Sequence, residues 1–231
     1  MKKKKIIIAT VKTWNIAAAR DFRKHNPCVS VRLILNRDHL RLAPVKKYNP
    51  DFIFFPHWSW KIPPDIYAAY PCVAFHMTDL PYGRGGSPLQ NLIVRGHRST
   101  KITAIRVTEE FDAGPVYLKR ALSLRGSAGE IYRRAAAVIF GRMMPAIVHG
   151  AITPRPQKGA AVVFRRRTPE ESDLVSVSSV PEAYDRIRML DAESYPRAFL
   201  ETKALRFEFF AAERKGRRLT ARVEICPKET A

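Results

Sequence analysis

The stretch CVAFHMTDLPYGRGGSP, residues 72–88, runs from four apolar positions through a histidine and an aspartate into a glycine-rich turn. The apolar positions predict a short buried strand, because turn residues bound them on both sides. Ser87 and Pro88 then begin a segment with apolar residues at helical spacing, which ends at Gly96. This order of strand, turn and helix puts His76 at the carboxyl end of a strand.

The residues before this stretch repeat the same alternation. Apolar runs at 5–10, 29–35 and 51–56 predict three earlier strands, residues 15–24 predict a helix, and residues 64–70 predict one or two helical turns. Strands that alternate with helices predict a parallel sheet covered by helices on both faces. Such sheets bind ligands at the carboxyl ends of their strands. We therefore expect His57, just beyond the third strand, and His76 on the functional rim.

The later part of the chain changes character after residue 150, where the run GAITPRPQKG is rich in Pro and Gly. Further elements are expected as strands at 101–108, 115–122 and 160–166, as helices at 127–150 and 181–191, and as a hairpin around Lys215–Gly216. Pro145 is expected to bend or end the long helix. The fold class is thus α/β, with a Rossmann-like parallel-sheet domain over 1–150 and a small β-rich subdomain over 151–231.

Composition limits where such a chain can work. No apolar stretch approaches the roughly 18 residues needed to cross a bilayer, and the N-terminal lysines precede only a short apolar segment. The sequence therefore predicts a cytoplasmic protein without membrane insertion. The segment after the N-terminal lysines is interpreted as the first strand and not as a signal peptide. Cys28, Cys72 and Cys226 lie far apart without metal-ligand spacing, so neither a disulfide framework nor a metal site is expected.

The charge is unevenly distributed. The formal net charge is +20, and residues 1–150 hold 25 basic and 9 acidic side chains, a net charge of +16. A basic field of this kind attracts phosphate-bearing partners such as nucleotides, RNA or anionic membrane surfaces. A generally basic, soluble surface without a specific partner is the alternative of equal weight.

Two blocks of residues carry a family resemblance. The first contains His76, the Leu80–Pro81 pair and the glycine-rich turn at 83–86, and the second contains Asp112 and Gly114, 36 and 38 residues beyond the histidine. Either block alone is weak, and a lone strand-end histidine is more often structural. Together they resemble the folate-dependent formyltransferase family, over about residues 5–150. The family includes enzymes that act on methionyl-tRNA, glycinamide ribonucleotide and nucleotide-linked sugars.

This resemblance implies N10-formyltetrahydrofolate as co-substrate and His76 and Asp112 as the catalytic pair. An imidazole beside a carboxylate suits the reaction, because it stabilises an oxyanion and manages a proton. The family also places an asparagine two residues before the histidine, where this chain has Ala74. Loss of one oxyanion donor typically costs a factor of about 10²–10³ in rate. We expect another group to fill this role, and Thr78 and Asn91 are the nearby polar candidates.

The resemblance also implies binding residues. Those expected at the folate are Phe55, His57, Trp58, Trp60, Gly83, Arg84, Gly85 and Asp112, and those expected at the acceptor substrate are Lys12, Thr13, Asn15, Thr78, Asp79 and Asn91. Arg84 is expected to be free to meet a carboxylate or phosphate. Each assignment has a structural alternative: the aromatic residues are equally well explained as core, and Thr13 as a helix cap.

The short C-terminal part favours one acceptor. Only about 80 residues follow the boundary, and these resemble the abbreviated end of the sugar-modifying branch. We therefore expect a nucleotide-diphosphate amino sugar as partner beside folate, in surface-glycan synthesis, with nucleic acid not expected to bind. The alternatives are another amine such as methionyl-tRNA, or a catalytically weakened RNA-binding or regulatory protein. The sequence does not identify the sugar or the nucleotide base, and it does not decide whether the protein forms a homodimer.

Overall fold

The computed structural model describes residues 3–228, and the chain in it forms two compact units. The first unit consists of residues up to 85 with 100–122 and 133–163, and the second of residues 86–99, 123–132 and 164 onward. The expected boundary at residue 150 does not coincide with this division. Two earlier segments group with the C-terminal part because hydrogen bonds join them. Arg188, for instance, donates to the carbonyl oxygens of Leu124 and Gly126 over 2.7 and 2.9 Å.

The first unit alternates strands and helices as expected. Its elements are β1 (Lys4–Ala9), α1 (Thr13–His25), β2 (Val29–Ile34), the 3₁₀ turn η1 (Arg37–His39), α2 (Leu42–Tyr48), β3 (Phe52–Pro56), α3 (Pro64–Ala69), β4 (Cys72–His76), β5 (Tyr82–Gly85), β6 (Ser99–Arg106), β7 (Val116–Ser123), the later residues of α5 (Ala128–Val138), the π-helical η2 (Ile139–Met143), α6 (Met144–His149) and β8 (Val162–Phe164).

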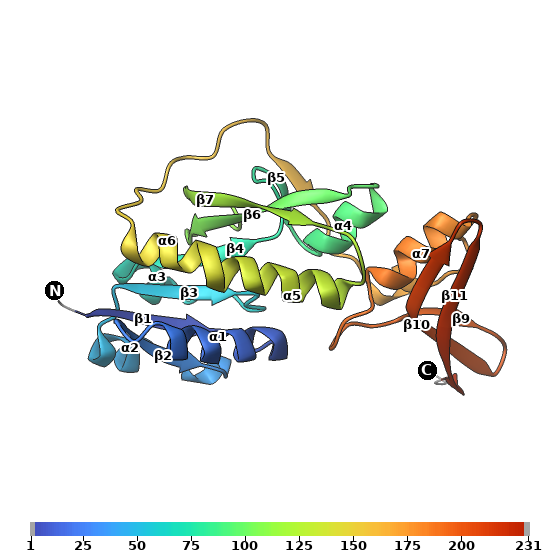
Figure 1. Ribbon diagram of the computed structural model, residues 1–231, viewed down its shortest axis with the longest axis horizontal. Helices are drawn as coiled ribbons and strands as arrows, with labels where there is room; N and C mark the ends of the chain where they lie inside the picture. Colours follow the sequence, from blue (N-terminus) through green and yellow to red (C-terminus); the bar gives the residue numbers. More distant parts are fainter. Residues whose placement is uncertain (1–2, 229–231) are drawn as a thin grey trace. The chain divides into compact units, whose positions relative to one another are not determined.

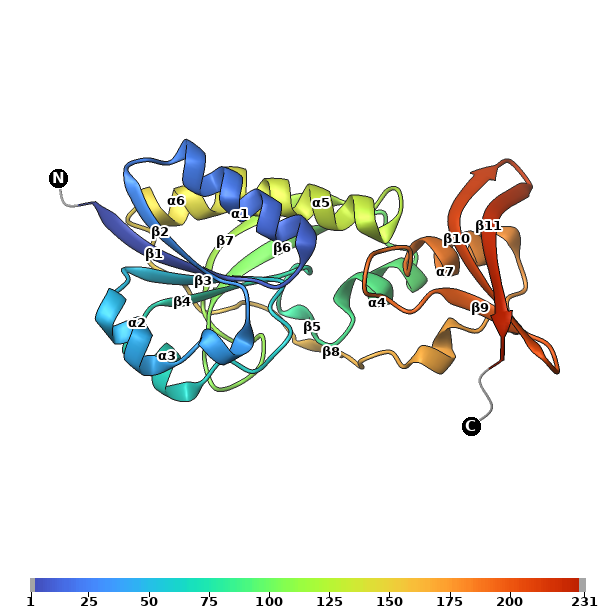
Figure 2. The same cartoon turned by 90° about the horizontal axis from the view of Figure 1, so that it is seen from below.

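Six of these strands form one sheet in the order β2-β1-β3-β4-β6-β7. The pairs β1–β2, β1–β3 and β3–β4 are parallel, whereas β4–β6 is antiparallel. The helices α1 and α6 lie on one face and α2 and α3 on the other (Figure 2). This confirms the α/β fold built on a parallel sheet. Central strands must be apolar on both faces, and residues 6–8 of β1 are accordingly fully buried isoleucines.

This arrangement brings the two expected histidines to one edge of the sheet. The strands β3 and β4 are parallel neighbours, with Phe54 opposite Val73 and Pro56 opposite Phe75. His57 directly follows β3 and His76 is the last residue of β4. Figure 1 shows β1, β3 and β4 side by side, so their carboxyl ends share this edge.

The long helix expected over 127–150 is interrupted. It runs as α5, then as the π-helical turn η2, then as α6, with Pro145 in the first turn of α6. Proline lacks an N–H and its ring clashes with the carbonyl four residues earlier. Widening the preceding turn into a π-helix relieves that conflict, so the proline neither ends nor sharply breaks the helical path.

Several short elements were not expected from the sequence. The helix α2 contains Pro44 near its start, where no intrahelical N–H bond is needed. The strand β5 spans four residues, two of them glycines with positive φ, and pairs with β8. The four-residue β9 (Ala198–Glu201) belongs to the second unit. None of them is long enough to show a periodic pattern.

The second unit combines helices with a three-stranded sheet. Its further elements are α4 (Pro88–Val94), the start of α5, η3 (Pro169–Ser172), α7 (Val180–Arg188), β10 (Leu205–Lys215) and β11 (Arg218–Pro227). The sheet order is β11-β10-β9, with antiparallel pairs. Lys215 lies opposite Arg218 around the turn, and Gly216 has φ 59°, so the expected hairpin is confirmed. Over residues 3–228, the structure contains no helix long and apolar enough to cross a membrane.

The aromatic core of the first unit provides a stability prediction. Phe54 is fully buried on β3, and its ring lies 5.7 and 6.1 Å from those of Phe52 and Phe75. Replacing it in Phe54→Ala leaves a cavity, so we expect the free energy of unfolding to fall by about 3–5 kcal/mol. Urea titration followed by circular dichroism measures this. Phe111→Ala deletes the same ring at a position 65% exposed and should change stability by less than about 0.5 kcal/mol. Equal losses in the two variants would contradict this account of the core.

Candidate functional site

The two residues at the centre of the sequence prediction, His76 and Asp112, meet in the structure. Nδ1 of His76 lies 3.3 Å from Oδ1 of Asp112, and Nε2 lies 2.7 Å from the carbonyl oxygen of Gly83. Both neighbours are hydrogen-bond acceptors, so the doubly protonated ring satisfies both at once. The pair joins the end of β4 to the turn between β6 and β7, although 36 residues separate the two side chains.

The carboxylate of Asp112 is held in its charged form. Burial raises its pKa, but the hydrogen bond and charge of His76, the N–H of Gly85 and the charge of Arg84 outweigh this and hold the pKa below its usual range. The Gly85 N–H donates to Oδ2 over 2.9 Å. Asp112 itself has φ 55°, a left-handed conformation that aspartate tolerates better than most residues. The site therefore keeps a fixed anion beside an imidazole.

The glycine-rich turn supplies backbone rather than side chains. Gly83 and Gly85 have φ of 78° and 99°, which other residues adopt only with strain. Their conformation aims the Gly83 carbonyl at His76 and the Gly85 N–H at Asp112. Arg84, expected to be free, is instead engaged within the chain: Nη1 donates to Glu110 over 3.0 Å, and Nε and Nη2 donate to Gln157.

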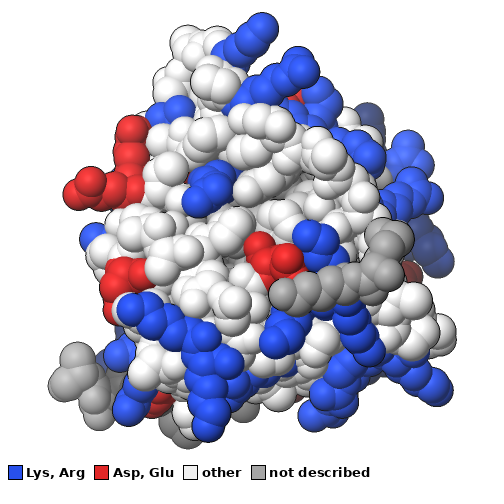
Figure 3. All heavy atoms as spheres, turned by 90° about the vertical axis from the view of Figure 1, so that its left-hand side faces the viewer, with Lys and Arg blue, Asp and Glu red and all other residues white. Residues whose placement is uncertain are grey.

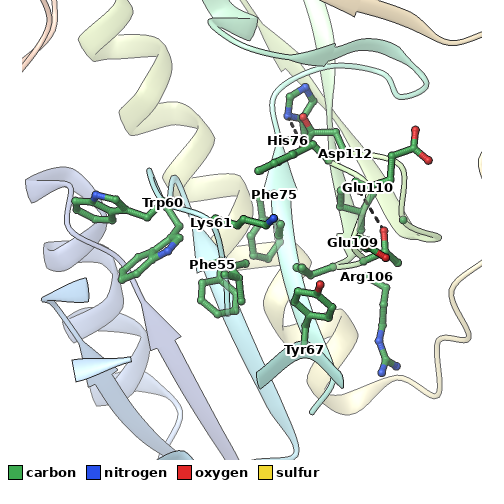
Figure 4. Close-up of a pocket in the computed structure, with 18 of the residues that line it drawn as sticks. Phe55, Trp60, Lys61, Tyr67, Phe75, His76, Arg106, Glu109, Glu110 and Asp112 are labelled. Atoms are coloured by element: carbon green, nitrogen blue, oxygen red, sulfur yellow. Dashed lines mark hydrogen bonds and ion pairs between the residues drawn. The ribbon is translucent and has the colours of Figure 1, made fainter. Parts of the chain in front are cut away.

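A cavity of about 170 Å³ opens beside this pair. His76 and Asp112 lie at one end of it, Trp60 lies at the other, and Phe55, Phe75 and Tyr67 line the space between them (Figure 4). The rings of Trp58 and Trp60 meet edge to face with centroids 5.1 Å apart. Ala74 is also in this wall. Flat apolar walls beside an ionic pair suit a planar ligand that reacts at one end.

His57 forms part of the wall as a neutral ring. The side-chain amide of Asn15 donates to Nδ1 over 2.9 Å, so the ring proton is on Nε2, which faces Sδ of Met77 at 3.0 Å. Burial first, and then the charge of Lys12, lower the pKa of His57 to about 4. At neutral pH this histidine is uncharged and structurally engaged.

Several of the residues expected at the acceptor substrate are engaged within the chain. Asn15 is fully buried and also donates to the Pro56 carbonyl, whereas Thr13 is exposed as the first residue of α1, where the structure shows no side-chain cap. Lys12 lies 5.8 Å from the Trp14 ring centroid. Asp79 pairs with Lys101 and Lys119 over 2.9 and 2.6 Å.

The polar groups considered as replacements at Ala74 are already used. The Thr78 hydroxyl is buried and donates to the Gly83 carbonyl over 3.3 Å. Asn91 belongs to the second unit, where its amide donates to Gly86, Ser87 and Arg165 over 2.9–3.1 Å. Lys61 is, like Arg106, a cation in the cavity wall, and its side chain extends toward Phe75 (Figure 4).

Several lining residues were not expected from the sequence, namely Lys61, Tyr67, Arg106, Glu110 and Phe111. Gln157, which is not among the lining residues, contacts the turn that carries Asp112. Tyr67 lies in a segment recognised only as one or two helical turns. Gln157 lies in the Pro/Gly-rich stretch interpreted as a boundary, and no local pattern marks a side chain that turns inward there.

Comparison with known proteins identifies related chains. The sequence family described as formyl transferase matches residues 23–138, and that described as methionyl-tRNA formyltransferase, C-terminal domain, matches residues 169–226. The solved methionyl-tRNA formyltransferase from Clostridium thermocellum is 48% identical, with a TM-score of 0.95, over 97% of this chain and 100% of that one. The methionyl-tRNA formyltransferase of Lactobacillus delbrueckii subsp. bulgaricus is 28% identical over 92% of this chain.

The lengths and the more distant structures add two facts. The chain spans 67%, 46% and 57% of the first three curated relatives it matches. HypX from Aquifex aeolicus in complex with tetrahydrofolic acid is 18% identical over 91% of this chain and 38% of that one, with a TM-score of 0.75. A likely sugar N-formyltransferase from Mycobacterium tuberculosis is 18% identical, with a TM-score of 0.68, over 87% of this chain and 93% of that one. At these identities the likeness shows the fold alone.

The neutral state of His57 predicts a pH dependence of stability. Because its pKa is lowered from 6.5 to about 4, the unfolded chain takes up a proton at a pH where the folded chain does not. The contribution of His57 to the free energy of unfolding should therefore be fully present above pH 6.5. It should be lost as the pH drops to about 4, which lowers the free energy of unfolding by up to about 3 kcal/mol. His57→Asn, which tolerates the positive φ of 50°, should lose stability less steeply in urea titrations over this range. Parallel declines in both proteins would contradict the prediction.

Proposed function

Because the chain belongs to the formyltransferase family, we propose that it transfers the formyl group of N10-formyltetrahydrofolate to an amine, and that this amine is the α-amino group of methionyl-tRNA. The observation that carries the reaction is the His76–Asp112 pair at the end of an aromatic-walled cavity. The tetrahydrofolate complex of the distant HypX structure agrees with folate as the co-substrate.

The cavity fits the folate by its chemistry. Phe55, Trp58 and Trp60 offer apolar faces to a planar ring, and His57 adds a neutral edge without a charge that would have to be desolvated. The co-substrate supplies an activated formyl group. The chain has to orient that group toward His76, exclude water and provide for the charge and the proton that the transfer moves.

His76 and Asp112 meet these two needs. The acceptor nitrogen attacks the formyl carbon, negative charge develops on the formyl oxygen, and the bond from carbon to the folate nitrogen breaks as that nitrogen gains the proton that the amine loses. The imidazolium of His76 donates to the developing oxyanion in place of its contact with the Gly83 carbonyl. The carboxylate of Asp112 stabilises that cation and fixes the ring.

The acceptor assignment rests on similarity and charge. The relatives at 48% and 28% identity are both methionyl-tRNA formyltransferases, and the second matched family describes the C-terminal domain of that enzyme. Arg37, Arg41 and Lys61 line a groove beside Trp60, which is 39% exposed. Figure 3 shows another face with abundant Lys and Arg. A basic field suits a polyanionic acceptor.

The nucleotide-sugar acceptor expected from the short C-terminal part has weaker support. The likely sugar N-formyltransferase from Mycobacterium tuberculosis and a sugar N-formyltransferase from Shewanella are 18% and 11% identical to this chain, a level that speaks to the fold and not to the substrate. We therefore prefer methionyl-tRNA, the alternative that the sequence left open, over the nucleotide-diphosphate amino sugar.

Removing either member of the pair tests the reaction. His76→Asn and Asp112→Asn should each lower the rate of formyl transfer by about 10²–10⁴-fold, because they remove the acid–base group or its counter-ion. Transfer of labelled formyl to methionyl-tRNA measures this, and circular dichroism checks that the variants fold. His149→Asn makes the same exchange at an exposed helix end and should keep the wild-type rate. Wild-type turnover in either site variant would contradict the assignment.

The salt dependence of binding tests the acceptor. Three phosphate contacts would weaken methionyl-tRNA binding by roughly 20- to 40-fold between 50 and 200 mM salt, and Arg41→Gln should reduce the slope of log K against log salt by about 1. Filter binding measures both quantities. Formylation of nucleotide-diphosphate amino sugars, with no formyl-methionyl-tRNA produced, would overturn the acceptor assignment and leave the reaction type standing.

A further inference from the structure

One glutamine outside the recognised motifs contacts the turn that carries Asp112. Gln157 lies between α6 and β8, where residues 155, 156 and 158–160 are all exposed. Its own side chain is half-buried. Nε2 donates to the carbonyl oxygens of Asp112 and Gly114 over 2.7 and 3.0 Å. One amide group thus binds two carbonyl oxygens of the turn.

The other end of the same amide is also held. Oε1 of Gln157 accepts hydrogen bonds from Nε and Nη2 of Arg84, over 3.3 and 3.0 Å. With two carbonyls on one side and a guanidinium on the other, only one orientation of the amide satisfies all partners. Gln157 therefore links Arg84 of β5 to Asp112 and Gly114 in the turn, while Arg84 itself pairs with Glu110 at the start of the turn.

The backbone around Gln157 is fixed before and after it. Val116 and Arg155 exchange two backbone hydrogen bonds of 2.7 and 2.9 Å, and the Val162 N–H donates to the Pro81 carbonyl over 3.2 Å. The amide is consequently delivered to the turn from a segment tied down on both sides. A side chain on such a support loses little further freedom when it binds.

The turn needs this support. Asp112 has φ 55°, an unfavourable conformation for a residue with a side chain. At Gly114, a Cβ would collide with the Arg106 carbonyl oxygen, so the turn lies tightly against β6. A left-handed conformation costs free energy even for aspartate, so contacts from the surrounding residues help to hold it. The bonds from Gln157 act on the carbonyl of Asp112 itself and on that of Gly114.

We propose that Gln157 is a positioning residue that fixes the turn at 110–114, so that the Asp112 carboxylate faces His76 during formyl transfer. The inference rests on the proposed function for its kinetic consequence, but its structural part concerns this chain alone. Gln157 is not among the residues that line the cavity, and in this proposal it acts through Asp112.

The kinetic test compares two replacements. Gln157→Leu removes both halves of the amide at similar size, and Gln157→Glu keeps the acceptor for Arg84 while losing the donor to the turn. Both should lower kcat by about 10- to 100-fold, since displacement of a catalytic group by about 1 Å has this effect, with KM values within about twofold of wild type. Ala160→Ser, on the exposed part of the same segment, is the matched control and should behave as wild type. Wild-type kcat in Gln157→Glu would overturn the proposal.

A second test separates positioning from general damage. In an Asp112→Asn background, adding Gln157→Leu should lower the single-turnover rate by less than about twofold, because both changes act on one group. A full additional 10-fold loss would overturn the proposal.

A third readout does not depend on turnover. The nitrogen NMR signals of the His76 ring should move in Gln157→Leu and in Gln157→Glu in the same direction as in Asp112→Asn, and stay unchanged in Ala160→Ser. Unchanged signals in folded Gln157 variants would overturn the positioning role. If Asp112→Asn keeps wild-type turnover, the proposed catalytic assignment fails, while these signals still decide whether Gln157 orients the carboxylate.

Discussion

The contact between the Asp112 carboxylate and the His76 ring is the constraint around which the site is built. The carboxylate stays charged although it is largely buried, and this requires the imidazole at one oxygen and the Gly85 N–H at the other. That N–H is available because Gly85 has a backbone conformation that only glycine adopts easily. The parallel sheet sets His76 at a strand end, and the turn bends through a left-handed Asp112 to meet it.

How much of this is visible in the sequence depends on the range of each interaction. The strands and helices of the parallel sheet repeat with local periods, so the runs at 5–10, 29–35 and 51–56 locate three of its strands within about a residue or two. His76 and Asp112 were found through two motif blocks. The sequence predicts a free Arg84 and gives no role to Gln157, because the partners of Arg84 lie 26–73 residues away and leave no local pattern. The division into units differs from the expected boundary for the same reason.

The interruption of the long helix illustrates a second limit. The sequence shows that Pro145 is incompatible with a regular α-helix, but it does not show whether the helix ends, bends or changes its hydrogen-bonding pattern. In the structure the turn before it widens into η2 and the helix continues as α6. Short elements such as β5 escape detection because glycine serves there for its backbone freedom, which carries no strand signal. Sequence patterns thus report burial well and backbone geometry poorly.

The division of roles between pocket and surface follows from charge. Much of the wall beside His76 is aromatic, and His57 in it is kept neutral, so under the proposed function this part of the pocket would receive a planar group without desolvating a charge. Such walls say little about the acceptor, whose amine is the same chemical group in a tRNA or a sugar. Discrimination between acceptors therefore has to come from the remainder of the molecule that carries the amine. Arg37, Arg41 and Lys61 line a groove beside Trp60 together with Asp38, and under the proposed function such surface charges, rather than the reacting pair, would distinguish one acceptor from another.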